Sequence, residues 1–218
     1  MNDTRPPRAS VVLPGDGEKL HAPSAARNQD SIVAFLRDHA PTKGTALEIA
    51  SGTGQHVCAY AAALPDMHWQ PTDIDPARLK SINAYVNDAA LGNVAPAQHL
   101  DATVPCWADR FGNQDLIVLV NLLHLISTSQ ATHLIHEAGK ALDPQGMLML
   151  YGPFKRDGLL TSTGDAEFDA SLRASDPDIG YKDTADIRRI IDAAGFALVD
   201  CFEMPANNLV FLARKDHT

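Results

Sequence analysis

The sequence predicts an α/β fold built on a doubly wound, mostly parallel sheet, and three observations indicate it. First, an apolar run over residues 45–50 is followed by Gly52, Gly54 and a helical stretch over residues 57–64. Second, strand and helix patterns alternate through most of the chain. Third, two strand patterns near the C-terminus are joined by so short a connection that they must form an antiparallel hairpin.

The first part of the chain is expected to lead into the domain rather than belong to it. Residues 1–23 carry prolines and glycines with little periodicity, so they predict an N-terminal arm, and residues 24–218 predict a single domain. Ser24 is expected to cap a helix that ends near His39. Arg27 and Asn28 fall in the first turn of that helix.

The turn after the first strand has the composition of a ligand-binding loop. Gly52 and Gly54 allow a sharp turn and let a ligand approach the backbone closely. The free N–H groups at the start of the next helix would face that ligand. A dinucleotide fingerprint needs a third glycine, but Val57 occupies its place, so that pattern is incomplete.

The second strand pattern, over residues 67–72, ends at Asp73, which lies 21 positions after Gly52. A carboxylate at that place can accept both ribose hydroxyls of an adenosine. Asp75 is expected to cap a following helix over residues 76–91, because Pro76 suits the first helical position. Asp183 is likewise expected to cap the last helix, which Gly195 ends.

Several sequence blocks resemble a known family of enzymes. The run Glu48-x-Ala50-Ser51-Gly52-Thr53-Gly54 resembles motif I of the class I S-adenosylmethionine-dependent methyltransferases. Further blocks in chain order resemble the methyltransferase-like 26 family, a class I methyltransferase family without an assigned substrate. These blocks are Ala25–Asn28, Ser51–His56, Trp69–Asp75, Tyr151–Lys155 and Met204–Asn208.

The resemblance implies a Rossmann-like three-layer fold and a cofactor. The expected sheet has seven strands in the order 3-2-1-4-5-7-6 with strand 7 antiparallel, and the expected cofactor is S-adenosylmethionine, leaving S-adenosylhomocysteine as product. The residues expected to bind the cofactor are Arg27, Asn28, Glu48, Ala50, Ser51, Gly52, Thr53, Gly54, Asp73, Ile74, Asp101, Ala102, Asn121 and Leu122.

The third and fourth strands end at further polar residues. A third strand over residues 94–100 leads to Asp101, which the resemblance places against the adenine amino group, and Trp107 could pack on adenine or in the core. Residues 114–121 form the clearest buried strand. Past it, His124 is the expected general base, because imidazole titrates near neutrality, unless it is merely hydrogen-bonded at the strand end.

The acceptor side is expected to form after the fifth strand, over residues 146–151. Residues 152–182 break the strand–helix rhythm and predict either an insertion that covers the substrate pocket or a structural excursion. Tyr151 is a second possible catalytic residue. The side chains expected to contact substrate are His124, Tyr151, Lys155, Tyr181, Asn207 and Asn208, although tight turns also favour asparagine.

The composition of the chain limits the kinds of binding partner that it can be expected to have. The formal net charge is −9 and no Lys/Arg-rich block occurs, which argues against nucleic acid. No apolar stretch is long enough to span a membrane, and three widely spaced cysteines suggest buried, reduced thiols, so a cytoplasmic protein is expected. His133 and His136 share a helix face without a third ligand, so no metal site is expected.

These observations predict a methyltransferase that transfers a methyl group in line to a small-molecule acceptor. The alternative is a module that binds S-adenosylmethionine without turnover. A nicotinamide-dependent oxidoreductase is a third possibility, since Tyr151 and Lys155 have the Tyr-x-x-x-Lys spacing. The intervening Gly152-Pro153 rules out the helix that would bring those two side chains together.

Overall fold

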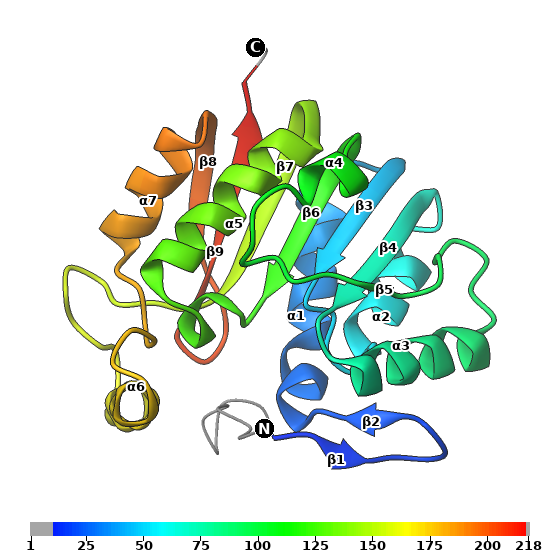
Figure 1. Cartoon of the computed structure of the whole chain (residues 1–218), viewed down its shortest axis with the longest axis horizontal. Helices are drawn as coiled ribbons and strands as arrows, with labels where there is room; N and C mark the ends of the chain where they lie inside the picture. Colours follow the sequence, from blue (N-terminus) through cyan, green and yellow to red (C-terminus); the bar gives the residue numbers. More distant parts are fainter. Residues whose placement is uncertain (1–10, 217–218) are drawn as a thin grey trace.

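A computed structural model describes residues 11–216 and confirms the predicted fold class. The main sheet has seven strands in the order β5-β4-β3-β6-β7-β9-β8, in which only β9 runs antiparallel to its neighbours (Figure 1). The strands are β3 (Gly44–Ile49), β4 (Met67–Asp73), β5 (Gln98–His99), β6 (Gln114–Val120), β7 (Leu142–Pro153), β8 (Phe196–Glu203) and β9 (Asn208–Lys215).

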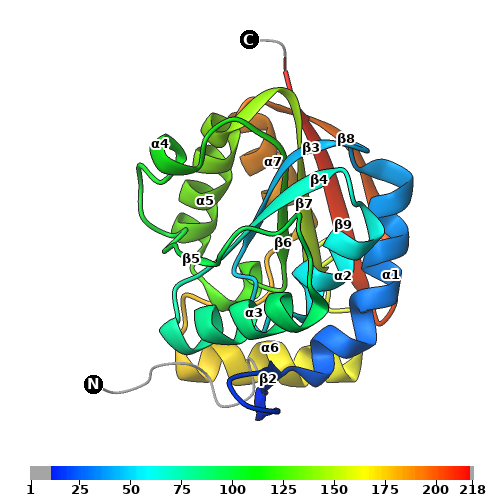
Figure 2. The same cartoon turned by 90° about the vertical axis from the view of Figure 1, so that its right-hand side faces the viewer.

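Helices cover both faces of this sheet, so its central strands are buried on both sides. Figure 2 shows α1 and α2 on one side and α4 and α5 on the other. The helices are α1 (Pro23–His39), α2 (Gln55–Ala63), α3 (Pro76–Ala89), α4 (Ala108–Phe111), η1 (Leu123–Leu125), α5 (Thr128–Ala141), α6 (Thr163–Ser175) and α7 (Thr184–Ala193).

The two faces bury different side chains because alternate residues of each strand point to opposite sides. In β3, Leu47 and Ile49 join the apolar core beneath α4, α5 and α7, whereas Ala46 joins the core beneath α1, α2 and α3. Glu48 points to the same side as Ala46, so a carboxyl group is buried beside the α1–α2 core.

The helix ends explain where several elements begin. Asp75 accepts from Ala77 N at 2.9 Å and Asp183 accepts from Ala185 N at 2.8 Å, so the predicted caps of α3 and α7 are confirmed. The predicted Ser24 cap is wrong, because α1 begins at Pro23 and Ala22 is the N-cap. A proline at the first helical position needs no N–H acceptor, which permits this start.

The third strand is much shorter than predicted. Within residues 94–100, β5 pairs with β4 and Val94 forms an isolated parallel bridge with Trp69, so the pairing is interrupted rather than continuous. Pro96 has no N–H to donate, and the Ala97 N–H donates to the Asn83 side chain at 2.9 Å rather than to a strand. A cysteine prediction is also corrected, since Cys106 is exposed.

The lead-in contains a small hairpin. Strands β1 (Leu13–Pro14) and β2 (Leu20–His21) pair in antiparallel fashion and lie beside the start of α1 and the first half of α3 (Figure 1). Residues 1–10 of the predicted arm fall outside the described part of the chain, and the division at residue 23 stays a prediction. Between residues 11 and 216, no helix has the length and apolar character that a membrane span requires.

Helix α5 provides a test of local stability. Ser127 and Gln130 form a capping box, with Ser127 N donating to Gln130 Oε1 at 2.8 Å and Gln130 N donating to Ser127 Oγ at 3.2 Å. We expect Ser127→Ala to lower the free energy of unfolding by about 1 kcal/mol, because an orphan N–H group loses its acceptor. Urea unfolding measures the change. Ser129→Ala in the same turn is the control and should stay within about 0.5 kcal/mol of wild type.

Candidate functional site

The loop between β3 and α2 holds its backbone in an unusual conformation. Ala50, Gly52 and Gly54 all have left-handed backbone angles, with φ of 54°, 62° and 94°. Ala50 carries a side chain in a region that costs non-glycine residues energy, and such strain concentrates at functional sites. The loop is held to β4 by Ser51 N, which donates to Thr72 O at 2.8 Å.

The two glycines meet different surroundings. A Cβ on Gly54 would lie 2.7 Å from the Ile82 Cα, so α3 packs too closely for any side chain there. A Cβ on Gly52 would meet nothing nearer than 4.0 Å, so the space beside Gly52 is open. The loop therefore has one glycine for packing and one that leaves room for a ligand to approach its backbone.

Asp73, at the end of β4, connects this loop to α3. Its Oδ2 accepts from Gly52 N at 2.9 Å and its Oδ1 accepts from Asp75 N at 3.0 Å, while Arg78 Nη1 lies 3.9 Å from Oδ2. The carboxylate is 2% exposed, and burial raises its pKa against the effect of these donors. Each oxygen keeps acceptor capacity beyond the one N–H bond.

The segment that carries Asp101 is joined to Asp73, and exposed apolar side chains follow both aspartates in the chain. Leu100 N donates to Asp73 O at 3.1 Å, which joins the end of β5 to the end of β4. Asp101 Oδ1 accepts from the backbone and hydroxyl of Thr103, at 2.9 and 2.6 Å. Ile74 is 54% exposed and Val104 is 47% exposed. Ile74 directly follows Asp73 in the chain and presents exposed apolar surface there, which suits a flat, partly apolar ring.

Trp107 belongs to the core. It is 5% exposed, packs with the apolar side chains beneath α4 and α5, and donates from Nε1 to Ala102 O at 3.2 Å. Of the two possibilities left open by the sequence, the structure therefore selects packing in the core.

A polar cluster is buried beneath α1 and α2. Glu48 Oε2, Tyr60 Oη and Tyr151 Oη have no hydrogen-bond partner among residues 11–216, and the three side chains are at most 2% exposed. Burial, and secondarily the nearby Asp73 charge, raises the pKa of Glu48 to about 7. Burial also raises the pKa of both tyrosines, so their hydroxyls stay protonated. Buried polar atoms without partners indicate that a polar guest or water completes this cluster.

The first turns of α1 reach the same cluster. The Asn28 side chain contacts His56 Nε2 at 2.9 Å through Oδ1, and it lies near the Tyr151 hydroxyl without a hydrogen bond of ordinary geometry. Arg27, one residue earlier, is exposed. Asn28 therefore connects α1 with α2 and β7, while Arg27 is available at the surface.

The end of β6 brings Asn121 next to β7. Asn121 is left-handed, with φ of 57°, and its N–H donates to Tyr151 O at 2.9 Å. Leu122 follows, and His124 lies in η1, 5% exposed. The His124 ring lies 5.7 Å from Phe168 and 6.0 Å from Tyr181, centroid to centroid.

His124 is a weak base in this environment. Burial, and secondarily the Lys182 ammonium, lowers its pKa to about 3. The ring is therefore neutral near pH 7, which leaves a lone pair free to accept a proton but provides little driving force for taking one. The expectation of a histidine that titrates near neutrality does not fit this burial.

Helix α6 contacts three of the predicted acceptor-side residues through two aspartates. Asp165 accepts from Tyr181 Oη and from Asn207 Nδ2, both at 3.1 Å. Asp169 accepts from Tyr181 N at 2.7 Å and lies 3.7 Å from Lys155 Nζ. Figure 1 shows α6 beyond the ends of β6 and β7, at the edge of the sheet that carries the loop.

Asn208 has a different role from Asn207. Its Nδ2 donates to Pro205 O at 2.9 Å and to Ala206 O at 3.2 Å. It therefore serves the β8–β9 turn, in which Ala206 and Asn207 are both left-handed. The turn explanation left open by the sequence accounts for Asn208, while the amide of Asn207 also reaches α6.

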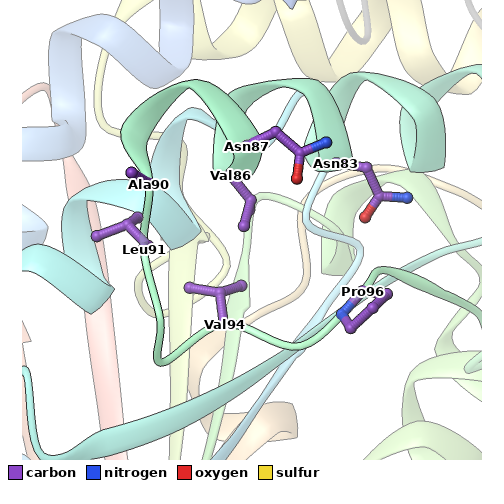
Figure 3. Close-up of a pocket in the computed structure, with 7 residues that line it drawn as sticks. All are labelled: Asn83, Val86, Asn87, Ala90, Leu91, Val94 and Pro96. Carbon is purple, nitrogen blue, oxygen red and sulfur yellow. The ribbon is translucent and has the colours of Figure 1, made fainter.

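A surface hollow lies away from these residues. It has a volume of about 430 Å³ and is lined by residues of α3 and of the segment leading to β5 (Figure 3). Its lining consists of Asn83, Val86, Asn87, Ala90, Leu91, Val94 and Pro96, none of which titrates. In the described part of the chain, no group of three or more His, Cys, Asp or Glu is arranged to hold a metal ion.

Sequence reasoning missed four contributors to the site. Gln55, His56, Tyr60 and Ser81 are all half-buried or buried around the loop, and Ser81 Oγ donates to Thr53 O at 2.7 Å. The Ser51–His56 block already contained Gln55 and His56, but nothing in its spacing indicated their partners in α1. Tyr60 and Ser81 appear in the sequence as ordinary residues of amphipathic helices.

A comparison with known protein families finds one that matches most of the chain. The family described as "Protein of unknown function (DUF938)" matches residues 19–215. That match extends from β2, the second strand of the hairpin, through the last strand, so it includes every part of the site described above.

Solved structures with a similar fold are methyltransferases. An O-methyltransferase family protein from Burkholderia thailandensis has a TM-score of 0.76 at 18% identity, over 88% of this chain and 57% of its own. An O-methyltransferase family 2 protein from Planctomyces limnophilus, in complex with apigenin, has a TM-score of 0.73 at 21% identity, over 88% of this chain and 60% of its own. Human N-acetylserotonin methyltransferase, in complex with S-adenosylmethionine, has a TM-score of 0.72 at 15% identity, over 88% of this chain and 53% of its own.

These similarities establish the fold, which is the Rossmann-like fold of class I methyltransferases. The chain spans at most 60% of the length of these three proteins, so it matches one part of each.

The buried Glu48 carboxyl gives a pH test of the site. Folded protein keeps a proton on Glu48 up to about pH 7, whereas the unfolded chain releases it near its ordinary pKa of 4.5. The contribution of protonated Glu48 to the free energy of unfolding is therefore fully present below pH 4.5 and is lost as pH rises through 7. We expect wild type to lose about 3 kcal/mol relative to Glu48→Gln between about pH 4 and about pH 8. Urea unfolding of both proteins across this range measures it, and parallel pH curves would contradict the burial of an unpaired carboxyl.

Proposed function

The chain belongs to the DUF938 family, and we propose that this member is an S-adenosylmethionine-dependent methyltransferase that acts on a small-molecule acceptor. The observation that carries the proposal is the junction of an open, left-handed glycine loop with the Asp73 carboxylate at the ends of adjacent parallel strands. Ligands of open α/β sheets bind at this edge, outside the carboxyl ends of the strands.

The residues at this edge fit the adenosine part of the cofactor. Asp73 has acceptor capacity left for the two ribose hydroxyls. Asp101 and the backbone of Ala102 would hydrogen-bond to the edge of the adenine, and the exposed Ile74 side chain would pack against the face of the ring. The open side of the loop at Gly52 would lie against the adenosine, since a side chain there would occupy the space that the cofactor needs.

The opposite end of the loop fits the amino-acid part of the cofactor. Arg27 would pair with the carboxylate and Asn28 would contact the same end, both from α1. Glu48 lies beneath the loop with an unpartnered oxygen and suits a nearby ammonium group. Asn121 and Leu122, at the end of β6, would lie beside the sulfur. The other loop residues assigned to the cofactor are Ala50, Ser51, Thr53 and Gly54.

When bound, S-adenosylmethionine supplies an activated methyl group, so the protein's task is to position the acceptor in line and to exclude water. Tyr151 offers a protonated hydroxyl, and His124 offers a neutral imidazole of low basicity. An acceptor that already has an available lone pair, or that ionises easily, therefore suits this site better than one that needs a strong base. Lys155, Tyr181 and Asn207 would form the wall on the α6 side, with Asn208 at its turn.

The finer assignments rest on the sequence. The five blocks support membership of the methyltransferase-like 26 group, and three of them meet around Asn28, His56 and Tyr151. The negative net charge supports a small molecule over nucleic acid, and a cytoplasmic location is proposed from composition. The alternative of a non-catalytic module shares the cofactor site and needs an occluded or featureless surface over the sulfonium, and the polar Asn121 and His124 and the insertion over residues 152–182 argue against it.

The deciding experiment is calorimetric titration with S-adenosylmethionine, S-adenosylhomocysteine and NAD in parallel. We expect the first two to bind with micromolar affinity and NAD to give no signal. Binding of NAD alone would overturn the cofactor assignment. Radiolabelled methyl transfer to a panel of small acceptors then separates a methyltransferase from a binding module, because only the enzyme transfers label.

Asp73 provides a residue-level test of the same proposal. We expect Asp73→Asn to weaken binding of S-adenosylhomocysteine by about tenfold to a hundredfold, because the ribose hydroxyls lose a charged acceptor worth about 1.5–3 kcal/mol. Titration calorimetry measures the affinity. Asp66→Asn, an exposed aspartate just before β4, should bind like wild type. Equal affinities for the Asp73 variant and wild type would remove Asp73 from the ribose site.

A further inference from the structure

Two neighbouring side chains at the start of α2 reach across to the start of α1. Gln55 Oε1 accepts from Ala22 N at 2.7 Å, and the same oxygen accepts from Thr53 Oγ1 at 2.9 Å. Ala22 is the N-cap of α1 and has no side chain able to cap it. Gln55 therefore joins the α1 N-terminus directly to the glycine loop.

His56 makes the second connection. Its Nε2 lies 2.9 Å from Asn28 Oδ1, and the Ala25 carbonyl also interacts with the ring. The ring stacks on Tyr60, with centroids 5.5 Å apart and planes 8° apart. Burial lowers the pKa of His56 to about 4, so the ring is neutral. It acts here as a hydrogen-bonding group held in a fixed plane.

The contacted positions lie on one face of α1. Ala22, Ala25 and Asn28 are three residues apart, which places them along one side of the helix. Arg27 lies beside this face and is exposed. The polar contacts from α2 therefore set the rotation and the height of the turn that carries Arg27 and Asn28.

The rest of α1 is anchored in another way. Its buried residues are Ile32, Phe35 and Leu36, all beyond the second turn, where they pack in the apolar core. In the first turn Ser24 and Ala26 are exposed. The N-terminal turns thus depend on polar contacts for their position, while the C-terminal turns depend on apolar burial.

We propose that Gln55 and His56 are positioning residues that dock the first two turns of α1 against the cofactor loop, so that Arg27 and Asn28 face the amino-acid end of the cofactor. The proposal rests on the proposed function, because it assigns a role at the same site. It predicts that losing these contacts weakens recognition of the amino-acid end and spares recognition of the adenosine end, which Asp73 and Asp101 serve.

A pair of ligands separates these two ends. S-adenosylhomocysteine carries both, whereas 5′-methylthioadenosine keeps the adenosine and the thioether and lacks the amino-acid end. We expect His56→Leu and Gln55→Leu to weaken S-adenosylhomocysteine binding by about tenfold, and 5′-methylthioadenosine binding by less than about twofold, by calorimetry. Gln55→Glu should bind both ligands like wild type, because a carboxylate oxygen accepts from the same two donors.

A histidine at the other end of α1 is the matched control. The His39 ring stacks on Phe35 with centroids 4.1 Å apart, and its Nδ1 donates to Phe35 O at 2.9 Å within the same helix, remote from the loop. His39→Leu should leave the ratio of the two affinities unchanged. Should His56→Leu fail to fold, the half-buried Gln55 pair still decides the question.

Each outcome of these titrations either supports or overturns the docking role of Gln55 and His56. Selective loss of S-adenosylhomocysteine affinity, restored in Gln55→Glu, supports the docking role. Equal weakening of both ligands overturns it, since the residues would then support only the loop, and unchanged affinities overturn it as well. If wild type binds neither ligand, the proposed function fails, and this inference fails with it.

Discussion

The hydrogen bond from Gly52 N to Asp73 Oδ2, 2.9 Å long, is the contact on which the organisation of the site depends. It fastens the left-handed loop after β3 to the end of β4, and the same carboxylate receives Asp75 N at the start of α3. Because the carboxylate is buried, it is costly to leave unpaired, so the loop and α3 are held in one arrangement. That arrangement keeps the space beside Gly52 open.

The two faces of the sheet differ in the side chains that they bury. The face beneath α4, α5 and α7 is covered by apolar side chains, which supply stability by burial. The face beneath α1, α2 and α3 also buries Glu48, Tyr60 and Tyr151 with unpartnered oxygens. A fold retains such groups at a cost, and functional sites are where that cost concentrates. Gln55 and His56 extend the same polar face outward to α1.

The proposed acceptor side is built from sequence-distant segments joined through α6. Asp165 and Asp169 hold Tyr181, Asn207 and Lys155 together, and Gly180 N donates to His124 O at 3.0 Å. The insertion is thus fastened to the end of β6 by several contacts. This burial also makes His124 a weak base, so positioning and desolvation contribute more to the proposed reaction than proton removal.

The sequence by itself determined the glycine loop, Asp73 at the next strand end, the closing hairpin and the caps at Asp75 and Asp183, because these depend on local periodicity, turn chemistry and fixed spacing. The sheet order was expected from the resemblance to class I methyltransferases. The sequence overestimated the third strand, because Pro96 has no N–H and Ala97 N donates to the Asn83 side chain, a partner that no local pattern shows. It misplaced the start of α1, because the N-cap Ala22 has no capping side chain and its N–H finds its acceptor in the distant Gln55. Only the tertiary structure decided the low basicity of His124, the raised pKa of Glu48 and the contacts of Gln55 and His56 with α1. Those properties arise from burial and from partners far apart in the chain, and both exist only after the chain has folded.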